Sequence, residues 1–147
     1  MDKQLIIYTD GVFDIPHYGH YKLFKYIKEL YPNSFLIIGV SSDQDCKSYK
    51  KTTILTQNER VMTLESCKYI DKILTNIPWI ITQEFIDKHS IDYICHDGNP
   101  YPCGDNKDIY KVWRDKGILI TTPRTDTIST SNIIERIISR SKKMHQM

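Results

Sequence analysis

Two histidines three positions apart are the residues of this chain whose chemistry is easiest to anticipate. They are His17 and His20, in the segment GVFDIPHYGH (residues 11–20), with Gly19 between them. In the first turn of a helix this spacing places both imidazoles on one face, where free backbone N–H groups and the helix dipole favour an anion. Gly19 leaves room for a phosphate to approach the backbone. The segment therefore predicts a phosphate-binding turn.

Two other interpretations of these histidines stay open. One or both rings can simply pack and hydrogen-bond beneath a sheet, as many buried histidines do. They can also bind zinc in an interaction module, but Asp14 is the only further ligand nearby and the spacing differs from the i, i+4 pair of HExxH proteins. The residue types therefore favour phosphate over zinc.

A second group of anion-binding residue types lies near the C-terminus. Arg124 precedes a run of hydroxyl side chains that leads into a helix-like apolar segment. The run consists of Thr125, Thr127, Ser129, Thr130 and Ser131. The plainer interpretation is a helix N-cap. An Arg fork, hydroxyls and a helix N-terminus together also form an anion cradle, and two cradles on one rim predict a triphosphate.

The composition describes an ordinary globular domain. The 147 residues are 40% hydrophobic and 26% charged, which predicts one domain over 1–147. Lys and Arg exceed Asp and Glu by only two and are scattered, so no nucleic-acid partner is expected. The N-terminal apolar run is too short for a signal peptide or membrane span, and the four cysteines lack CxxC spacing. Both features predict a cytoplasmic protein with reduced thiols.

Short β-branched apolar runs alternate with segments of helical periodicity along the chain. We expect strands at 4–9, 35–40, 72–75, 91–96 and 118–122, and helices at 16–30, 56–70, 82–90, 108–117 and 131–140. Pro16 suits a first helical turn, Thr56 and Glu59 form a capping-box pattern, and the tail from about residue 140 is expected to be disordered.

This alternation predicts an α/β fold: a Rossmann-like doubly wound sheet of about five parallel strands with helices on both faces. Ligands of such folds bind beyond the carboxyl ends of the strands. The loops DGVFD, SSDQDCKSYKK, NIPW, HDGNPY and PRTDTISTS follow the five expected strands, and they carry most of the reactive side chains. Lys50 and Lys51, in the second loop, are either solvated or able to swing over a bound polyphosphate.

HYGH matches the HxGH signature of a nucleotidyltransferase superfamily, and RTDTISTS matches the RTxGISTS signature of the cytidylyltransferases. PNSFLIIGVSSD, NER, YID, IPW and HDGNPY appear between them in the expected order. From about residue 8 to 137 the chain therefore resembles the cytidylyltransferase family, in particular its phosphocholine-specific branch.

The resemblance implies transfer of a cytidylyl group from CTP to phosphocholine, giving CDP-choline and pyrophosphate for phospholipid synthesis, with Mg²⁺ held mainly by the CTP phosphates. It implies His17, His20, Lys50 and Arg124 as catalytic residues. The implied CTP contacts are Gly11, Val12, Phe13, His17, His20, His96, Arg124, Thr125, Ile128, Ser129 and Thr130. The implied phosphocholine contacts are Asp14, Lys50, Trp79, Tyr101 and Tyr110, with aromatic faces and the Asp14 carboxylate receiving the quaternary ammonium.

Two positions depart from the family pattern. Thr127 replaces a glycine of the second signature, so we expect crowding or a different backbone bend there. Lys51 replaces a glycine after Lys50, so either lysine is a candidate for the reaction centre.

Several alternatives and partners follow from the same comparison. Phosphoethanolamine or glycerol 3-phosphate is an alternative acceptor, ATP an alternative nucleotide, and a non-catalytic nucleotide-binding protein an alternative class. The pattern around CKYIDKI implies a homodimer. The family's eukaryotic members often carry a long membrane-binding amphipathic helix, but the tail SRSKKMHQM is too short for one, so no membrane-binding segment is expected.

Overall fold

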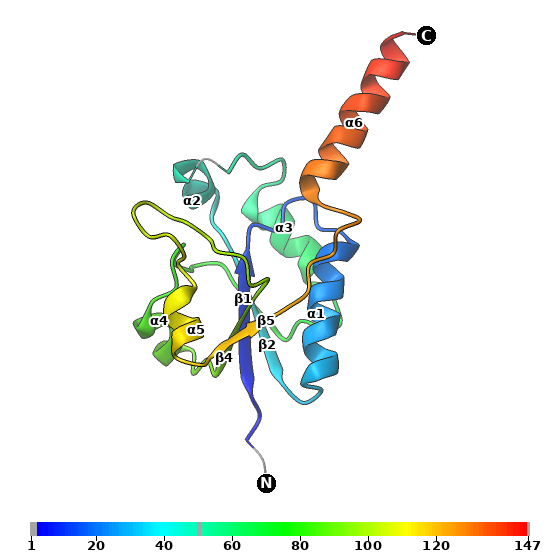
Figure 1. Ribbon diagram of the computed structural model, residues 1–147. Helices are drawn as coiled ribbons and strands as arrows, with labels where there is room; N and C mark the ends of the chain where they lie inside the picture. Colours follow the sequence, from blue (N-terminus) through cyan, green and yellow to red (C-terminus); the bar gives the residue numbers. More distant parts are fainter. Residues whose placement is uncertain (1–2, 50, 147) are drawn as a thin grey trace.

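The computed structural model of the protein describes residues 3–49 and 51–146, and its centre is a five-stranded parallel sheet (Figure 1). The strands are β1 (Ile6–Gly11), β2 (Phe35–Val40), β3 (Lys72–Leu74), β4 (Tyr93–His96) and β5 (Leu119–Thr121). Their order across the sheet is β3-β2-β1-β4-β5. The predicted Rossmann-like doubly wound sheet is confirmed.

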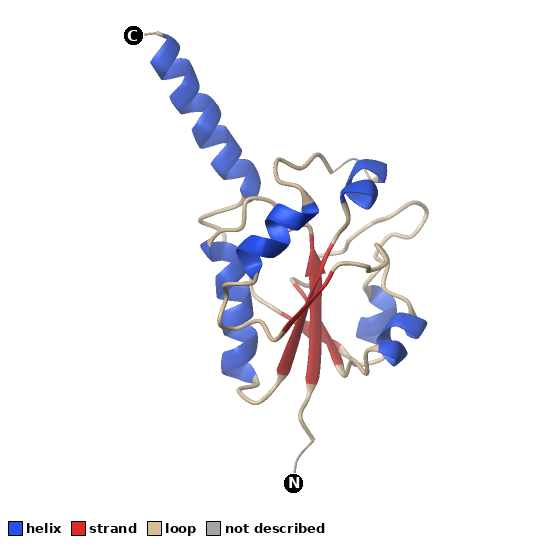
Figure 2. Ribbon diagram, turned by 180° about the vertical axis from the view of Figure 1, so that it is seen from behind, coloured by secondary structure: helices blue, strands red, loops and turns tan. Residues whose placement is uncertain are grey.

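Six helices in the described part of the chain connect or follow the strands. Helices cover both faces of the sheet (Figure 2). The six are α1 (Tyr18–Leu30), α2 (Asp43–Ser48), α3 (Gln57–Leu64), α4 (Gln83–Lys88), α5 (Lys111–Asp115) and α6 (Thr130–His145). Helices α1 and α3 lie on one side, α4 and α5 on the other (Figure 1). The strands are therefore sandwiched, which explains why they read as continuous apolar runs.

Two apolar clusters form the core, one on each face of the sheet. Phe24 and Ile27 of α1 and Leu64 of α3 pack on one face. Phe85 of α4 and Trp113 of α5 pack on the other. The packing on each face thus fixes the positions of the helices. The N-termini of these helices, or the loops before them, reach the carboxyl edge of the sheet.

Several boundaries differ from the expected ones. Segment 43–48, expected as loop, is helix α2, because Ser42 caps it by accepting a hydrogen bond from the Asp45 amide at 3.0 Å. Pro16 precedes the N-cap His17 instead of lying in the first turn. Helix α3 ends at Leu64, earlier than expected, although the Thr56–Glu59 capping box is present.

The C-terminal helix is longer than expected. A helix was expected over residues 131–140, whereas α6 extends from Thr130 to His145 and projects from the body (Figure 1). Basic residues in its last turn, Lys142, Lys143 and His145, complement the negative end of the helix dipole.

Candidate active site

Many of the predicted ligand residues lie at the carboxyl edge of the sheet, near the ends of the paired strands β1 and β4. The chain leaves β1 toward β2 and returns to the opposite side of β1 as β4, so connections diverge at this point. Such a switch point opens a crevice in doubly wound sheets. Asp10 and Gly11 end β1 there, and His96 ends β4.

His17 and His20 together form an unusual capping box at the start of α1. Nδ1 of His17 accepts a hydrogen bond from the Gly19 amide at 3.1 Å, and Nδ1 of His20 accepts one from the His17 amide at 3.2 Å. The rings stack 3.8 Å apart. Because both Nδ1 atoms are acceptors, the neutral rings carry their protons on Nε2, where they can donate to a ligand.

Burial keeps both imidazoles neutral at physiological pH. It lowers the pKa of His17, and burial together with the neighbouring His17 lowers the pKa of His20 to about 4. Nε2 of His17 is buried and has no hydrogen-bond partner. A buried donor without a partner is costly unless a ligand receives it, so this atom marks a site for an acceptor such as phosphate oxygen.

The loop between β1 and α1 is held in a strained conformation. Phe13 and Ile15 have φ of 54° and 44°, a region that non-glycine residues seldom adopt. The buried Phe13 ring lies edge-on to His20 at 5.3 Å. A Cβ on Gly11 would lie 3.0 Å from the Phe13 ring. The strain therefore seats Phe13 beneath the histidine pair, as is common where function sets the geometry.

Three contacts join the two signature segments, which are more than 100 residues apart in the sequence. The Tyr18 and Thr127 hydroxyls hydrogen-bond at 2.9 Å, and the Thr130 hydroxyl donates to the Asp14 carbonyl at 2.8 Å. A Cβ on Gly19 would lie 3.0 Å from Cγ2 of Ile128. The structure thus brings both predicted anion cradles together, at the N-termini of α1 and α6.

The second cradle is open toward solvent. Ser129 caps α6 by accepting from the Asn132 amide at 3.0 Å. Arg124 is exposed and Thr125 is half-buried. The second cradle therefore consists of an exposed cationic side chain, Arg124, and a helix N-terminus that Ser129 caps.

A compact group of aromatic rings lies near the carboxyl ends of β1 and β4. The Tyr110 ring stacks on His96 at 3.8 Å, and Tyr101 meets both rings edge-on at 6.2 Å. The Tyr110 hydroxyl donates to Asp10 Oδ1 at 3.0 Å. We call His96, Tyr101, Tyr110 and Asp10 the aromatic cluster.

The aromatic cluster contains one poorly solvated carboxylate. Burial raises the pKa of Asp10 to about 6, although hydrogen bonds, chiefly that from Tyr110, oppose the shift. Burial also lowers the pKa of His96, whose Nδ1 lies 3.3 Å from the Asp97 carboxylate. Asp10 is thus the negative charge beside the rings at neutral pH, and a cation bound there would restore part of its lost solvation.

Comparison with known proteins agrees with this geometry. A family model described as cytidylyltransferase-like matches residues 8–136. The chain belongs to the cytidylyltransferase-like family. It is 44% identical over 137 residues to choline-phosphate cytidylyltransferase of Saccharomyces cerevisiae, covering 93% of this chain and 32% of the relative. It is 39% identical to choline-phosphate cytidylyltransferase A of Homo sapiens, covering 93% and 37%.

A more distant relative and one solved structure complete the comparison. Ethanolamine-phosphate cytidylyltransferase of Mus musculus is 27% identical, covering 98% of this chain and 35% of the relative. The lipopolysaccharide core biosynthesis protein from Thermoplasma volcanium GSS1 shares the fold, with a TM-score of 0.62 at 20% identity over 86% of this chain and all of that one. This cytidylyltransferase-like chain spans roughly a third of these curated relatives.

In this cytidylyltransferase-like chain, Asp14 makes its hydrogen bonds outside the aromatic cluster. Its buried carboxylate accepts hydrogen bonds from the backbone amides of Ile54 and Leu55, at 2.7 and 2.9 Å, and not from the aromatic cluster. Asp14 therefore ties the segment before α3 to the β1–α1 loop. The carboxylate beside the rings is Asp10, which the sequence analysis missed.

The three aromatic residues expected to surround an ammonium group separate into two sets. Tyr101 and Tyr110 belong to the aromatic cluster, whereas Trp79 stacks on Tyr49 at 4.5 Å. Lys51 places its Nζ 5.9 Å from the centre of the Tyr101 ring. Lys50, expected to bridge nucleotide and acceptor, lies outside the described residues.

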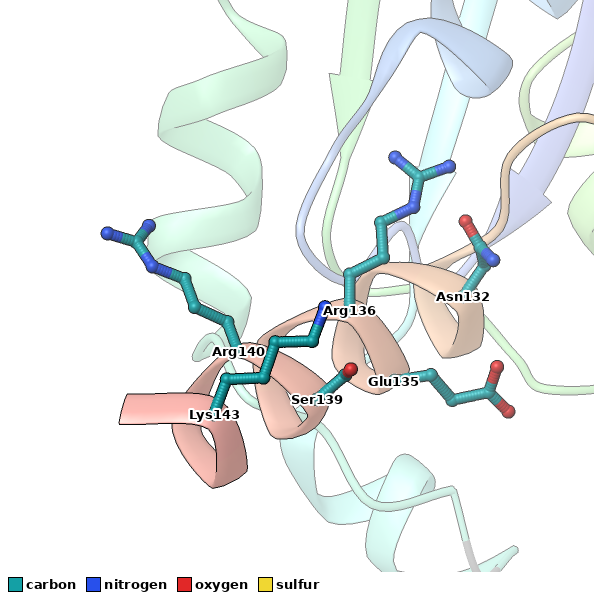
Figure 3. Close-up of a pocket in the computed structure, with 6 residues that line it drawn as sticks. All are labelled: Asn132, Glu135, Arg136, Ser139, Arg140 and Lys143. Carbon is teal, nitrogen blue, oxygen red and sulfur yellow. The ribbon is translucent and has the colours of Figure 1, made fainter. Parts of the chain in front are cut away.

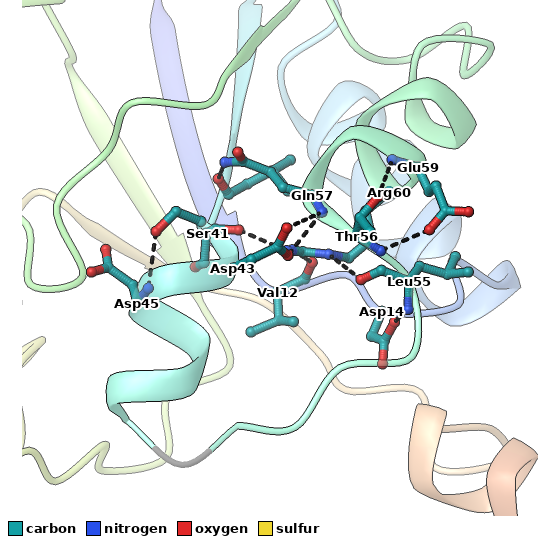
Figure 4. Close-up of polar contacts among 12 residues, drawn as sticks. Val12, Asp14, Ser41, Asp43, Asp45, Leu55, Thr56, Gln57, Glu59 and Arg60 are labelled. Atoms are coloured by element: carbon teal, nitrogen blue, oxygen red, sulfur yellow. Dashed lines mark hydrogen bonds and ion pairs between the residues drawn. The ribbon is translucent and has the colours of Figure 1, made fainter.

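Arg60 is fully buried and joins several loops near the candidate site (Figure 4). The Arg60 guanidinium donates to the carbonyls of Val12, Ser41 and Leu55 and to Asp43 Oδ1, at 2.6 to 3.2 Å. It thereby joins the segments that follow β1 and β2 to the start of α3. The NER motif contained this residue, but its burial could not be read from the sequence.

Of two surface hollows, the smaller lies beside the aromatic cluster, because Lys51 lines it and also lies over the Tyr101 ring. The larger, about 440 Å³, is a shallow face of α6 lined by Asn132, Glu135, Arg136, Ser139, Arg140 and Lys143 (Figure 3). The smaller, about 230 Å³, is lined by Asp43, Cys46, Lys47, Lys51, Thr52 and Thr53. The larger lies on a projecting helix away from the aromatic cluster, so shape alone would have misplaced the site.

Two structural findings bear on the remaining expectations. Within residues 3–49 and 51–146, no three His, Cys, Asp or Glu side chains gather as metal ligands would. In the same part of the chain, no helix has the length and apolar character that crossing a bilayer requires.

Proposed function

We propose that this chain transfers a cytidylyl group from CTP to phosphocholine. A phosphate oxygen of phosphocholine attacks the α-phosphorus of CTP, the bond from that phosphorus to the β-phosphate oxygen breaks, and CDP-choline and pyrophosphate form. The 39–44% identity to choline-phosphate cytidylyltransferases over 93% of the chain supports this reaction. The 27% identity to an ethanolamine-phosphate enzyme is weaker support for that acceptor.

The observation that carries the nucleotide half of the proposal is the unpaired, buried Nε2 of His17. It lies at the N-terminus of α1, and Gly19 in the same turn lies close to Ile128 of the second cradle, which suits a triphosphate held between two positive helix ends. Nε2–H donors aimed at the phosphates stabilise charge that builds up in the transition state. Arg124 adds a flexible cation at the open side.

The aromatic cluster supports phosphocholine as the acceptor. A quaternary ammonium has no N–H to donate, so its binding depends on aromatic faces and a nearby negative charge. Tyr110, Tyr101 and His96 supply the rings and Asp10 the charge. A phosphate monoester is already largely dianionic at neutral pH, so the reaction needs alignment and no activated nucleophile.

We propose that Mg²⁺ enters with CTP. This ion is commonly bound through one or two carboxylates and substrate phosphates, and the described residues form no cluster of three metal ligands. The Asp14 oxygens already accept backbone hydrogen bonds. The ion would supply charge neutralisation on the triphosphate, while His17, His20 and Arg124 orient it.

Magnesium-dependent pyrophosphate release tests the proposal. The assay uses CTP with phosphocholine, phosphoethanolamine or glycerol 3-phosphate, and ATP as the nucleotide control. We expect release with CTP and phosphocholine. Release with another acceptor would refute the choline assignment, and CTP binding without release from any acceptor would indicate a non-catalytic nucleotide-binding protein.

Lysine variants assign the role that the resemblance gives to Lys50. We expect Lys50→Ala to lower turnover on the order of a hundredfold, as loss of one charge-stabilising donor does. Lys51→Ala is the matched control. If only Lys51→Ala lowers turnover, the role belongs to Lys51.

We also propose a homodimer in the cytoplasm. The family pattern around residues 67–73 supports the dimer, and the absence of a bilayer-spanning helix among the described residues is compatible with the compartment. Light scattering after size exclusion tests the dimer, since a molar mass near 17.3 kDa would refute it.

A further inference from the structure

We propose that Asp108 is a positioning residue for the acceptor site, because its carboxylate holds the backbones of both tyrosines of the aromatic cluster in one arrangement. The inference rests on the proposed function. It adds a residue that touches neither substrate and that acts through Tyr101 and Tyr110.

One carboxylate binds three groups at this position. Asp108 Oδ1 accepts hydrogen bonds from the backbone amides of Tyr101, at 3.2 Å, and Tyr110, at 3.0 Å. Oδ2 accepts from Nη1 of Arg114 on α5 at 2.9 Å. The Asp108 side chain is only 10% exposed. The two tyrosines thus share one anchoring atom, and the anchor is itself tied to a helix.

The loop that carries Tyr101 closes on this anchor. The Ile109 amide donates to the Tyr101 carbonyl at 2.9 Å, and a bridge between Cys103 and Asn106 closes the turn inside it. The Asp108 amide donates to the side chain of Asn106 at 3.0 Å. The two ends of the segment from Tyr101 to Ile109 therefore lie side by side, next to Asp108.

Each anchored residue reaches a different part of the aromatic cluster. Tyr110 stacks on His96 and donates to Asp10, whereas Tyr101 presents its ring at a right angle to Tyr110. A shift of either backbone would change the angle between these rings and the distance to the Asp10 carboxylate. Since cation–π attraction depends on that placement, Asp108 sets the shape of the site for an ammonium group.

The charge of Asp108 is maintained by its partners. Partial burial opposes ionisation, but the hydrogen bond from Arg114 and those from the two tyrosine amides hold its pKa below the usual range. Charge-assisted hydrogen bonds of this kind are stronger than neutral ones. Asp108 is thus a firm anchor at neutral pH.

Steady-state kinetics with each substrate varied in turn test the inference. Asp108→Ala removes all three bonds, whereas Asp108→Asn keeps an oxygen for the amides and loses the charge facing Arg114. We expect the KM for phosphocholine to rise about tenfold in Asp108→Ala and less in Asp108→Asn, while the KM for CTP changes less than about twofold. Asp105→Asn, at an exposed position of the same loop, is the matched control.

The outcomes separate the inference from the proposed function. If wild type and Asp105→Asn release no pyrophosphate, the proposed function fails. If they do and the Asp108 variants leave the KM for phosphocholine unchanged, or raise both KM values equally, Asp108 is no positioning residue.

Arg114→Leu keeps the test decisive should Asp108→Ala not fold. The variant preserves the hydrogen bonds from the Tyr101 and Tyr110 amides to Asp108 and removes only the bond from Arg114 to Asp108. We therefore expect a smaller rise in the KM for phosphocholine. Adding Tyr110→Phe to Asp108→Asn should cost less than the sum of the single changes. Full additivity would contradict action through Tyr110.

Discussion

His17 and His20 owe their orientation to the backbone amides that they cap. Ser, Thr, Asp and Asn usually accept these amides at helix N-termini. Here imidazole nitrogens do so, which places the protons of both neutral rings on Nε2. Nδ1 of each ring is thus used for capping, and Nε2 stays available for the proposed phosphate contact, so substitution can separate the two roles.

A pair of His17 variants tests this separation. Asparagine can cap the helix but has no donor at the Nε2 position, whereas alanine can do neither. We expect both His17→Asn and His17→Ala to lower kcat/KM about a hundredfold or more, and only His17→Ala to lose about 1 kcal/mol of unfolding free energy. Turnover assays and urea denaturation measure the two effects. Near-normal turnover in His17→Asn would mean that the histidine serves only as a cap.

Asp10 is expected to weaken the fold for the benefit of the site. Its pKa in the folded protein is about 6, so the folded protein holds this proton more tightly than the unfolded chain does. The resulting penalty is absent at acid pH, grows as pH rises through the range from about 4 to 6, and persists above it. Asp10→Asn should therefore raise the unfolding free energy at pH 7.5 by about 1–3 kcal/mol, with little gain at pH 4.

The same Asp10→Asn variant should bind phosphocholine more weakly, because the negative charge beside the rings is lost. Melting curves at the two pH values and the KM for phosphocholine provide the measurements. A stabilised variant with an unchanged KM would remove Asp10 from the acceptor site.

At the scale of elements, the candidate site depends on loops that are joined to one another by hydrogen bonds. Thr127, expected to crowd the second signature, is exposed and bonds to Tyr18 at 2.9 Å. It is not among the described non-glycine residues with positive φ, which are Phe13, Ile15 and Ser90. The backbone there does not require glycine, so threonine is accommodated without distortion.

Thr127→Gly tests whether the threonine obstructs the nucleotide. We expect loss of an exposed hydrogen bond worth about 0.5–1.5 kcal/mol and no gain in turnover. Tyr18→Phe removes the same bond without adding backbone freedom and serves as the control. A roughly tenfold rise in kcat/KM for CTP in Thr127→Gly alone would show that threonine hinders the site.

The arrangement of the loops that Arg60 joins depends on its single buried charge. Its removal would leave three carbonyls and the Asp43 carboxylate without their donor. Hydrogen bonds from the Gln57 amide and from Arg60 keep the pKa of Asp43 low against the effect of desolvation. We expect Arg60→Met to cost about 3–5 kcal/mol of unfolding free energy. Arg136→Met, on the exposed face of α6, is the control for denaturation, and equal stabilities would contradict the role of Arg60.

At the scale of the whole molecule, the domain divides into a packed body and a projecting helix. Residues of α6 from Glu135 onward are exposed, whereas Ile133 and Ile134 are half-buried. Figure 1 shows α6 projecting from the body. Only the first turn of α6 therefore contributes to the cradle formed by Ser129 and Thr130.

Truncation tests this division. Deleting residues 139–147 removes the outer part of α6, of which the described residues 139–146 are exposed, so we expect a melting temperature within about 2 °C of wild type and unchanged kcat/KM. Differential scanning fluorimetry and the pyrophosphate assay measure both. A large loss of activity would mean that the outer turns of α6 pack against another chain.

The sequence alone was sufficient for the doubly wound sheet and for the helices that begin at the HYGH and RTDTISTS segments, and phosphate binding by these segments stays a prediction. Apolar periodicity reports which segments are buried, and the HYGH and RTDTISTS residues are local markers of helix starts. It was less reliable for short elements such as α2, whose six residues depend on the cap at Ser42.

Only the tertiary structure decided how these parts meet. Asp10 lies at the end of β1 and Asp14 in the loop that follows, and no local pattern distinguishes the carboxylate beside Tyr110 from the one bound to the Ile54 amide. The burial of Arg60 and the anchoring by Asp108 also join segments brought together by folding. Solvation and hydrogen-bond partners depend on such distant neighbours, so the sequence determined which residues could act and the fold determined what each one touches.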